Sequence, residues 1–191
     1  MLKFGTLVIG ATAAIALVAC GGDGEPTGTV RLALESSGST PANVKAVELK
    51  IAGVDVHIAH EADAAESSEE GGSWLSTNDR PGTLNLLDLR NHLDEELGEL
   101  DAHGPITQVR LRLDAMDGGR VVFKDGRSCP IDTSTIDPTG IRVVEPFFVI
   151  EPEEEGDTRI VLDIDVRESL VEVAPCNYKL RPVLRMSRIE R

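Results

Sequence analysis

Aromatic side chains are scarce in this sequence. Phe, Tyr and Trp together make up 3% of the residues, with one Trp and one Tyr. Bases and sugars are recognised largely by stacking on aromatic faces, so any such platform would have to be small. Positive charge is also short, because 19 Lys and Arg residues stand against 33 Asp and Glu residues, for a net charge of −14. An acidic surface repels phosphate backbones, and we expect no nucleic-acid partner.

The motifs of common catalytic sites are missing. The sequence has no Gly-x-Ser-x-Gly elbow, no His-Glu-x-x-His pair and no glycine-rich phosphate-binding loop. Carboxylate pairs such as Glu95/Glu96 and Asp163/Asp165 are of the kind that hydrolyse glycosides, but no aromatic-rich cleft accompanies them. We therefore expect no enzyme and no catalytic residues, and keep a cell-envelope hydrolase as the lesser alternative.

No apolar run is long enough to span a bilayer as a helix, which takes about 20 residues. Residues 4–19 are apolar or small and follow Lys3, a pattern typical of a cleaved secretory signal. Their ending, Leu17-Val18-Ala19-Cys20, resembles the bacterial lipobox. That resemblance implies cleavage before Cys20 and a lipid on its sulfur, whose several chains would give a stable membrane anchor. The alternative is an ordinary signal with an incidental cysteine.

Cleavage would change the net charge from −14 to −15, because Lys3 is lost. The next residue, Gly21, is not Asp, which by analogy with lipoprotein sorting favours the outer membrane. We divide the chain into a signal peptide at 1–19, the lipidated cysteine and a Gly-rich spacer at 20–28, and a single domain at 29–189.

Only three cysteines are present. With Cys20 assigned to the lipid, Cys129 and Cys176 remain, and two cysteines allow one pairing. The compartment beyond the inner membrane is oxidising, which favours a disulfide. It would close a loop of roughly 48 residues and add about 4 kcal/mol in the chain-entropy model. The alternative is two buried free thiols.

Apolar side chains alternate with polar ones along most of the domain, which predicts roughly nine or ten short strands and an all-β, mainly antiparallel β-sandwich. A linker carrying Cys176 is expected before the last strand. The predicted strands lie at 29–34, 44–58, 74–75, 83–89, 106–115, 120–124, 128–132, 139–151, 159–167 and 177–189.

Four details of this pattern are specific enough to check. The alternation in 44–58 changes phase at Ala52-Gly53, which predicts a β-bulge that keeps both halves facing one core. Residues 106–115 and 120–124 are expected to form a hairpin. Pro182 predicts an edge strand or a strand margin. The leucines of 91–100 share one helical face, which predicts one short helix.

Six stretches stand out when the chain is followed in order: GTVRLAL (28–34), VKAVELKIAGVDVH (44–57), LNLLDLRN (84–91), TQVRLRLDA (107–115), LDIDV (162–166) and YKLRPVLR (178–185). Together they resemble the bacterial lipoprotein domain called domain of unknown function 4382. The resemblance spans about residues 28–188 and implies a surface lipoprotein with a β-sandwich fold. It implies no reaction and no catalytic residues. The acidic stretch at 61–73 and the Cys129/Cys176 pair look particular to this sequence.

Two aspartates form the best candidate metal site. Asp163 and Asp165 would lie on one strand face, about 7 Å apart, and could share a calcium ion with oxygens from Asp114 or Asp117. The sequence has no EF-hand spacing. The alternative is a solvated face paired with nearby arginines, where each ion pair contributes little. No other cofactor is expected.

Two of the histidines, His57 and His60, lie three residues apart at the end of a predicted strand. Binding of a transition metal needs more converging ligands than these two. We interpret them as exposed loop residues.

The sequence thus predicts a lipid-anchored, non-enzymatic module of the bacterial cell envelope, held to the membrane through Cys20, in which calcium is an optional ligand. It would bind or scaffold a protein or a glycan with the loops far from Cys20 or with an open sheet edge. A calcium-stabilised adhesion-type module is the alternative. Neither the partner nor the biological process follows from the residues.

Overall fold

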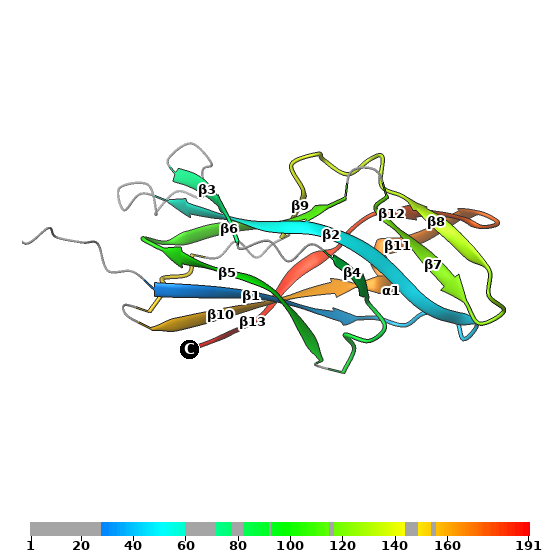
Figure 1. The fold of residues 1–191 in the computed structure, drawn as a ribbon, viewed down its shortest axis with the longest axis horizontal. Helices are drawn as coiled ribbons and strands as arrows, with labels where there is room; N and C mark the ends of the chain where they lie inside the picture. The colour runs from blue at the N-terminus through cyan, green and yellow to red at the C-terminus, as the bar shows by residue number, and fades with distance from the viewer. Residues whose placement is uncertain are drawn as a thin grey trace, which may run out of the picture.

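The computed structural model describes residues 28–59, 72–77, 82–91, 93–114, 117–143, 149–153 and 156–191. Within these ranges the chain forms thirteen strands and one four-residue helix, arranged in two sheets (Figure 1). The predicted all-β class is therefore confirmed. The predicted lipid attachment at Cys20 lies outside the described residues.

The smaller sheet has four strands in the order β13-β10-β1-β5. Its strands are β1 (Gly28–Ser37), β5 (Asp94–Ala102), β10 (Asp157–Asp165) and β13 (Leu184–Glu190). The pairing of β1 with β10 is parallel, and the other two pairings are antiparallel. β5 and β13 are the two edges of this sheet.

The larger sheet has nine strands in the order β11-β12-β8-β7-β2-β6-β9, with β3 and β4 paired to the other side of β2. The parallel pair β12·β8 is its exception to antiparallel pairing. Its strands are β2 (Val44–Ala59), β3 (Gly72–Ser76), β4 (Gly82–Asn85), β6 (Ile106–Leu113), β7 (Gly119–Phe123), β8 (Ser128–Asp132), β9 (Ile141–Arg142), β11 (Leu170–Ala174) and β12 (Asn177–Leu180).

The 16-residue strand β2 contains the predicted bulge. Its register against β6 shifts between Ile51 and Gly53, so Leu49 before the shift and Val54 after it are both fully buried. The bulge therefore keeps both halves of β2 in one core, as the change of phase predicts.

The predicted hairpin between 106–115 and 120–124 is wrong. β6 and β7 do not pair with each other; they follow one another along the same side of β2. Lys50 lies at the junction, where its carbonyl accepts from Asp114 N–H and its own N–H donates to the Gly118 carbonyl. β2 is long enough to pair with both strands end to end, which the local alternation cannot show.

The predicted helix over 91–100 is also wrong, because β5 occupies most of this stretch. The register of β5 against β1 skips Leu97, and this irregularity lets Leu97 and Leu100, three residues apart, both be buried. The helical spacing therefore comes from a bulged strand. Leu93, the third leucine of the supposed helical face, is 62% exposed.

Further boundaries differ from the sequence prediction. The strand at 83–89 ends at Asn85, and the stretch at 139–151 contributes only β9 and one bridge at Ile150 within its described residues. The expected linker after β10 is the short helix α1 (Val166–Ser169) followed by β11. The single strand predicted at 177–189 is wrong, because β12 belongs to the larger sheet and β13 to the smaller one; Pro182 lies between them, and β13 is an edge strand, as the proline predicts.

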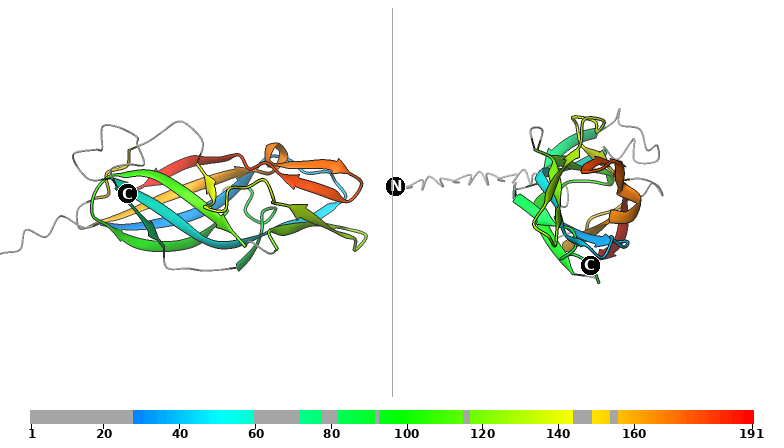
Figure 2. Two further views of the ribbon diagram at one scale, coloured as in Figure 1. Left: turned by 90° about the horizontal axis from the view of Figure 1, so that it is seen from above. Right: turned by 90° about the vertical axis from the view of Figure 1, so that its right-hand side faces the viewer.

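The sandwich is elongated, and its two ends differ. β1 begins at one end, whereas the hairpins β7–β8 and β11–β12 lie at the opposite end (Figures 1 and 2). β2 runs between the two ends, and at about 3.3 Å per residue its 16 residues span roughly 53 Å. We call the end with the two hairpins the distal end.

Gly119 provides a test of the approach of β7 to β2. It has φ +150°, and a Cβ at this position would lie 2.1 Å from the Glu48 carbonyl oxygen. We expect Gly119→Ala to lower the free energy of unfolding by more than the 1–3 kcal/mol typical of backbone strain alone. The measurement is the urea midpoint at constant slope.

Gly126→Ala is the matched control for this test. Gly126 also has a positive φ, +90°, but a Cβ there would meet nothing within 4 Å. Gly126→Ala should therefore lower the free energy of unfolding by the backbone strain alone, without the added cost of a steric clash. Equal losses in the two variants would contradict the close contact at Gly119.

Candidate functional site

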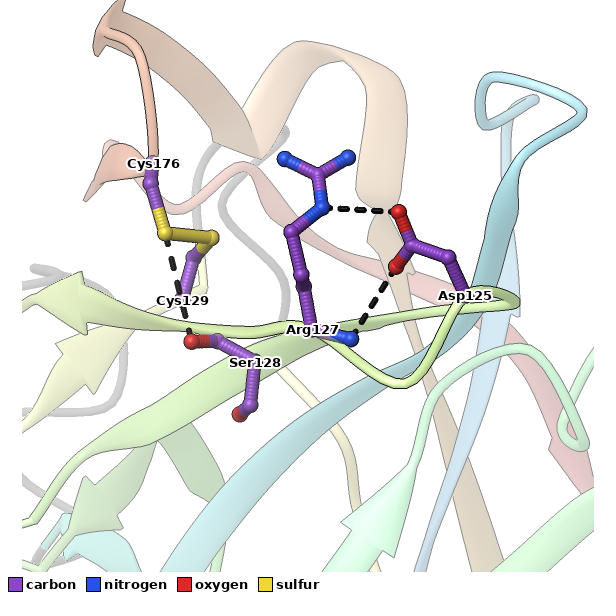
Figure 3. The surroundings of a disulfide bond; sticks show 5 residues. All are labelled: Asp125, Arg127, Ser128, Cys129 and Cys176. Atoms are coloured by element: carbon purple, nitrogen blue, oxygen red, sulfur yellow. Dashed lines mark hydrogen bonds and ion pairs between the residues drawn. A yellow bond between two sulfur atoms is a disulfide. The ribbon is translucent and has the colours of Figure 1, made fainter.

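A disulfide ties the two hairpins of the distal end together (Figure 3). Cys129 of β8 is bonded to Cys176, in the turn between β11 and β12, with 5.0 Å between the Cα atoms, which confirms the predicted pairing. β12 pairs with β8 at only two positions, Tyr178 with Ile131 and Lys179 with Asp132. The covalent bond therefore reinforces a ladder too short to fix the β11–β12 hairpin alone.

Aromatic packing holds the inner side of the same hairpin. The rings of Phe123 and Tyr178 lie 6.4 Å apart, and the guanidinium carbon of Arg127 lies 4.9 Å above the Phe123 ring. Tyr178 is 7% exposed, and burial, followed by the nearby Glu172 carboxylate, raises the pKa of its hydroxyl. These contacts and the disulfide fix the position of β12 and thereby of β11.

Arg127 is itself oriented by Asp125 in the β7–β8 turn. The Arg127 backbone N–H and Nε both donate to the Asp125 carboxylate, at 3.0 and 2.7 Å (Figure 3). The backbone hydrogen bond and then the side-chain one lower the pKa of Asp125. The distal turn is therefore locally ordered beside the disulfide.

β11 is an open edge of the larger sheet. Among the described residues it pairs with β12 alone, and Val173 is 54% exposed. Val171 is half-buried and faces Lys179 of β12, whereas the register shifts between Glu172 and Ala174 and leaves Val173 without a partner position on β12. Glu172 is the single charged residue of β11.

The other ends of the two sheets are protected in ways that natural proteins use against edge-to-edge pairing. β9 has only two residues. β13 carries Arg185, Arg188 and Glu190. β5 carries five acidic residues: Asp94, Glu95, Glu96, Glu99 and Asp101. β3 and β4, beside β2, lack charge as well, but the large apolar side chain of β3 at the surface, Leu75, is less exposed than Val173, at 38%.

Ion pairs across the smaller sheet engage the charges of β13. Arg188 donates to Glu35 and Asp94 at 2.6 Å each and to Glu190 at 2.7 Å. Arg159 of β10 also pairs with Asp94 and Glu190. Hydrogen bonds from Arg159 lower the pKa of Asp94, and those from Arg188 lower the pKa of Glu190. The arginine-bearing edge is thus held to its own sheet.

Asp163 lies in an open cleft of about 440 Å³ beside this network, with Glu35, Ser37 and Arg185 also in the lining. Its Oδ2 accepts from Ser37 Oγ at 2.6 Å, whereas its Oδ1 is buried without a hydrogen-bond partner among the described residues. Burial, and then the charge of Glu35, raises the pKa of the Asp163 carboxyl. This environment makes the negative charge of Asp163 costly, which disfavours the carboxylate that a calcium ion needs as a ligand.

The structure does not bring the four predicted calcium ligands together. Asp163 and Asp165 belong to β10 of the smaller sheet, whereas Asp114 and Asp117 follow β6 of the larger one. Asp165 accepts from the Glu168 N–H at the start of α1, and Asp117 pairs with Lys50. Within the described ranges, no group of three or more His, Cys, Asp or Glu residues could hold a metal ion.

A packed polar cluster on β2, β3 and β6 was not predicted. His57 is 1% exposed, so its prediction as an exposed histidine is wrong, and His60 lies outside the described residues. The His57 ring lies 5.1 Å from that of Trp74, and the Arg110 guanidinium lies 3.5 Å from the Trp74 ring. Alternation places these side chains on one face, but it does not indicate that the face is covered.

The sequence prediction places a linker where the structure has β11. The signal was present: Leu170-Val171-Glu172-Val173-Ala174 is a short run rich in β-branched residues between a helix and a turn. The run is only five residues long and is followed closely by Cys176, so the pattern did not lead to a predicted strand.

Comparison with protein families gives a match over most of the chain. The family model described as Domain of unknown function (DUF4382) matches residues 27–182, which covers every strand except β13. No curated protein and no solved structure matches the chain. Among the residues with described positions, no helix is long and apolar enough to cross a membrane.

Asp163 generates a prediction about pH. Because its pKa is raised in the folded protein, the unfolded chain ionises first as the pH rises, and stability falls between the ordinary value of 3.8 and the folded pKa. Asp163→Asn keeps an acceptor for Ser37 and cannot ionise. We expect it to raise the melting temperature at pH 7, with a gain that shrinks as the pH falls towards 3.8.

Asp101→Asn is the control, since it removes the same charge from an exposed position on β5. It should not show this pH-dependent gain. A lower melting temperature of Asp163→Asn at pH 7 would contradict the account of a destabilising buried carboxylate.

Proposed function

The chain belongs to the family of Domain of unknown function (DUF4382), and on that premise we propose that it is a lipid-anchored, non-enzymatic module of the bacterial cell envelope that binds a macromolecular partner. The lipid would be attached to Cys20, and the binding surface would be the open edge of β11. We infer the outer membrane as its location from Gly21 after the lipobox-like ending.

The position of β1 supports the orientation in this proposal. β1 starts at Gly28, eight positions after Cys20, and an extended segment of eight residues reaches at most about 28 Å. The end where β1 begins would therefore stay near the membrane. The distal end, with β11, would project away by up to the length of β2, which favours contact with a partner outside the bilayer.

The single observation that carries the binding role is the contrast between β11 and the other sheet ends. β5 has five acidic residues and β13 has ion-paired arginines, whereas β11 exposes Val173 and has only Glu172 as a charge. An exposed edge with a single charge is a liability unless something pairs with it. The disulfide holds this edge in one conformation, as a binding surface requires.

Replacing the lipid-bearing cysteine tests the anchor. We expect Cys20→Ser to move the protein from the membrane fraction to the soluble fraction and to abolish incorporation of labelled palmitate, because the thiol is the attachment atom. The Cys129→Ser, Cys176→Ser double variant removes the other thiols and should keep the label. A parent chain that takes up no label would contradict lipidation.

Placing a charge on the edge tests the binding surface. We expect Val173→Lys to reduce the capture of ligand from envelope extracts by about ten-fold, equivalent to about 1.4 kcal/mol, because a buried ammonium disfavours strand pairing. Val149→Lys is the matched control, since Val149 is 49% exposed and lies outside the named strands. Undiminished capture by Val173→Lys would remove β11 as the binding surface.

A further inference from the structure

We propose that the ligand of β11 is an extended peptide segment with the pattern apolar–basic–apolar, which adds to the larger sheet as one more strand. This inference rests on the proposed function and names the partner class of the same surface. Its elements are the free side of β11, the chemistry of three consecutive side chains, and the net charge of the chain.

The free side of β11 offers backbone hydrogen bonds along a five-residue strand. Within the described residues its partner is β12, so the groups on its other side face no strand. An added strand would satisfy them by main-chain pairing, while alternate side chains would give specificity. This favours an extended peptide over a glycan, which cannot continue the ladder.

The side chains of β11 set the pattern of the incoming strand. Val171 and Val173 flank Glu172 along the strand, and cross-strand pairs of β-branched residues stabilise a sheet. Two apolar residues, one on each side of a central position, would pair with them. Val173 is more exposed than any other large apolar side chain in the described strands, so it gains most from being covered.

Glu172 sets the central position. It lies between the two valines and is exposed. Opposite charges facing each other across two strands are stabilising and like charges destabilising, so a Lys or Arg fits opposite Glu172. The net charge of −14 acts in the same direction, because it attracts a basic segment and repels an acidic one.

The same residue disfavours a second copy of the chain as the occupant. A symmetric antiparallel pair of β11 strands with full overlap places Glu172 of one copy opposite Glu172 of the other. Two facing carboxylates would destabilise this pair. A shifted register avoids the contact only by shortening a strand that has five residues.

The disulfide makes the surface rigid before the partner arrives. Cys176 lies in the hairpin turn, and its bond to Cys129 fixes the strand that β11 pairs with. A preorganised edge loses less conformational entropy on binding than a mobile one. Reduction of this bond would therefore weaken binding of the peptide.

The test uses two peptides that differ at one residue, Gly-Ser-Thr-Val-Lys-Val-Thr-Ser-Gly and its counterpart with Glu in place of Lys. Each is titrated into the isotope-labelled full chain in mild detergent, and amide shifts are followed by NMR. We expect the Lys peptide to shift the amides of β11 and to bind at least about ten-fold more tightly than the Glu peptide. Glu172→Lys should reverse this preference, and Val149→Lys should leave it unchanged.

The outcomes separate this inference from the proposed function. Equal binding of both peptides, unchanged in Glu172→Lys, would overturn the charge rule. Binding of neither peptide, while Val173→Lys still reduces capture of the envelope ligand, would overturn the peptide class and leave the binding surface intact. If neither peptide binds and Val173→Lys captures the envelope ligand undiminished, both the peptide class and the β11 binding surface are overturned. A concentration-dependent dimer in sedimentation, with shifts at β11, would identify a second copy instead.

Discussion

Burial of one face of β2 over its whole length is the constraint on which the larger sheet depends. Sixteen residues in perfect alternation would keep a single face, but the apolar residues of β2 change phase halfway, and the bulge at Ala52-Gly53 restores them to the core. Once both halves are buried, β2 offers two long sides. β6 and β7 pair along one, and β3 and β4 along the other. From β7 the sheet continues through β8 and β12 to the open edge of β11.

The distal end depends on a few contacts because its strands are short. β8, β11 and β12 have four or five residues each, which leaves little ladder to hold them. The disulfide and the ring of Tyr178 against Phe123 replace the missing pairing. At the edges of the smaller sheet the protein instead relies on charge, with arginines of β13 and β10 bridging to Asp94. The edge of the larger sheet is thus held by a disulfide and aromatic packing, and the edges of the smaller sheet by ion pairs.

Period-two alternation was enough to predict the all-β class and the bulge in β2, and the proline at 182 was enough to predict a strand margin, because these features are local. It failed where pairing partners decide the outcome. Leu97 and Leu100 have helical spacing, yet a bulge against β1 produces the same spacing in a strand. β7 pairs with β2 and not with β6 because β2 is long enough to pair with both strands. The residues of β6 and β7 alone do not show this length.

For the candidate site, the sequence predicted the disulfide, because only two cysteines remained once Cys20 had a role. It did not predict the exposed edge of β11. Whether a strand is exposed depends on which other segments pack against it. The five residues of β11 alone do not show this. Burial of His57 and of Arg110 beside Trp74 was missed for the same reason. The charges of Asp163 and Asp114 suggested a shared metal, but their strands belong to different sheets.

Residue-resolved amide hydrogen exchange in the oxidised full chain is the most direct test of the central claim that β11 is a rigid, open edge. Amides of β11 directed at β12 should exchange slowly, and those directed away from it should exchange as fast as exposed backbone. Such alternation over residues 170–172, before the register shift in β11, is the predicted result. Uniform strong protection would show that the edge is already covered, and uniform fast exchange would show that the hairpin is not held; either would contradict the account.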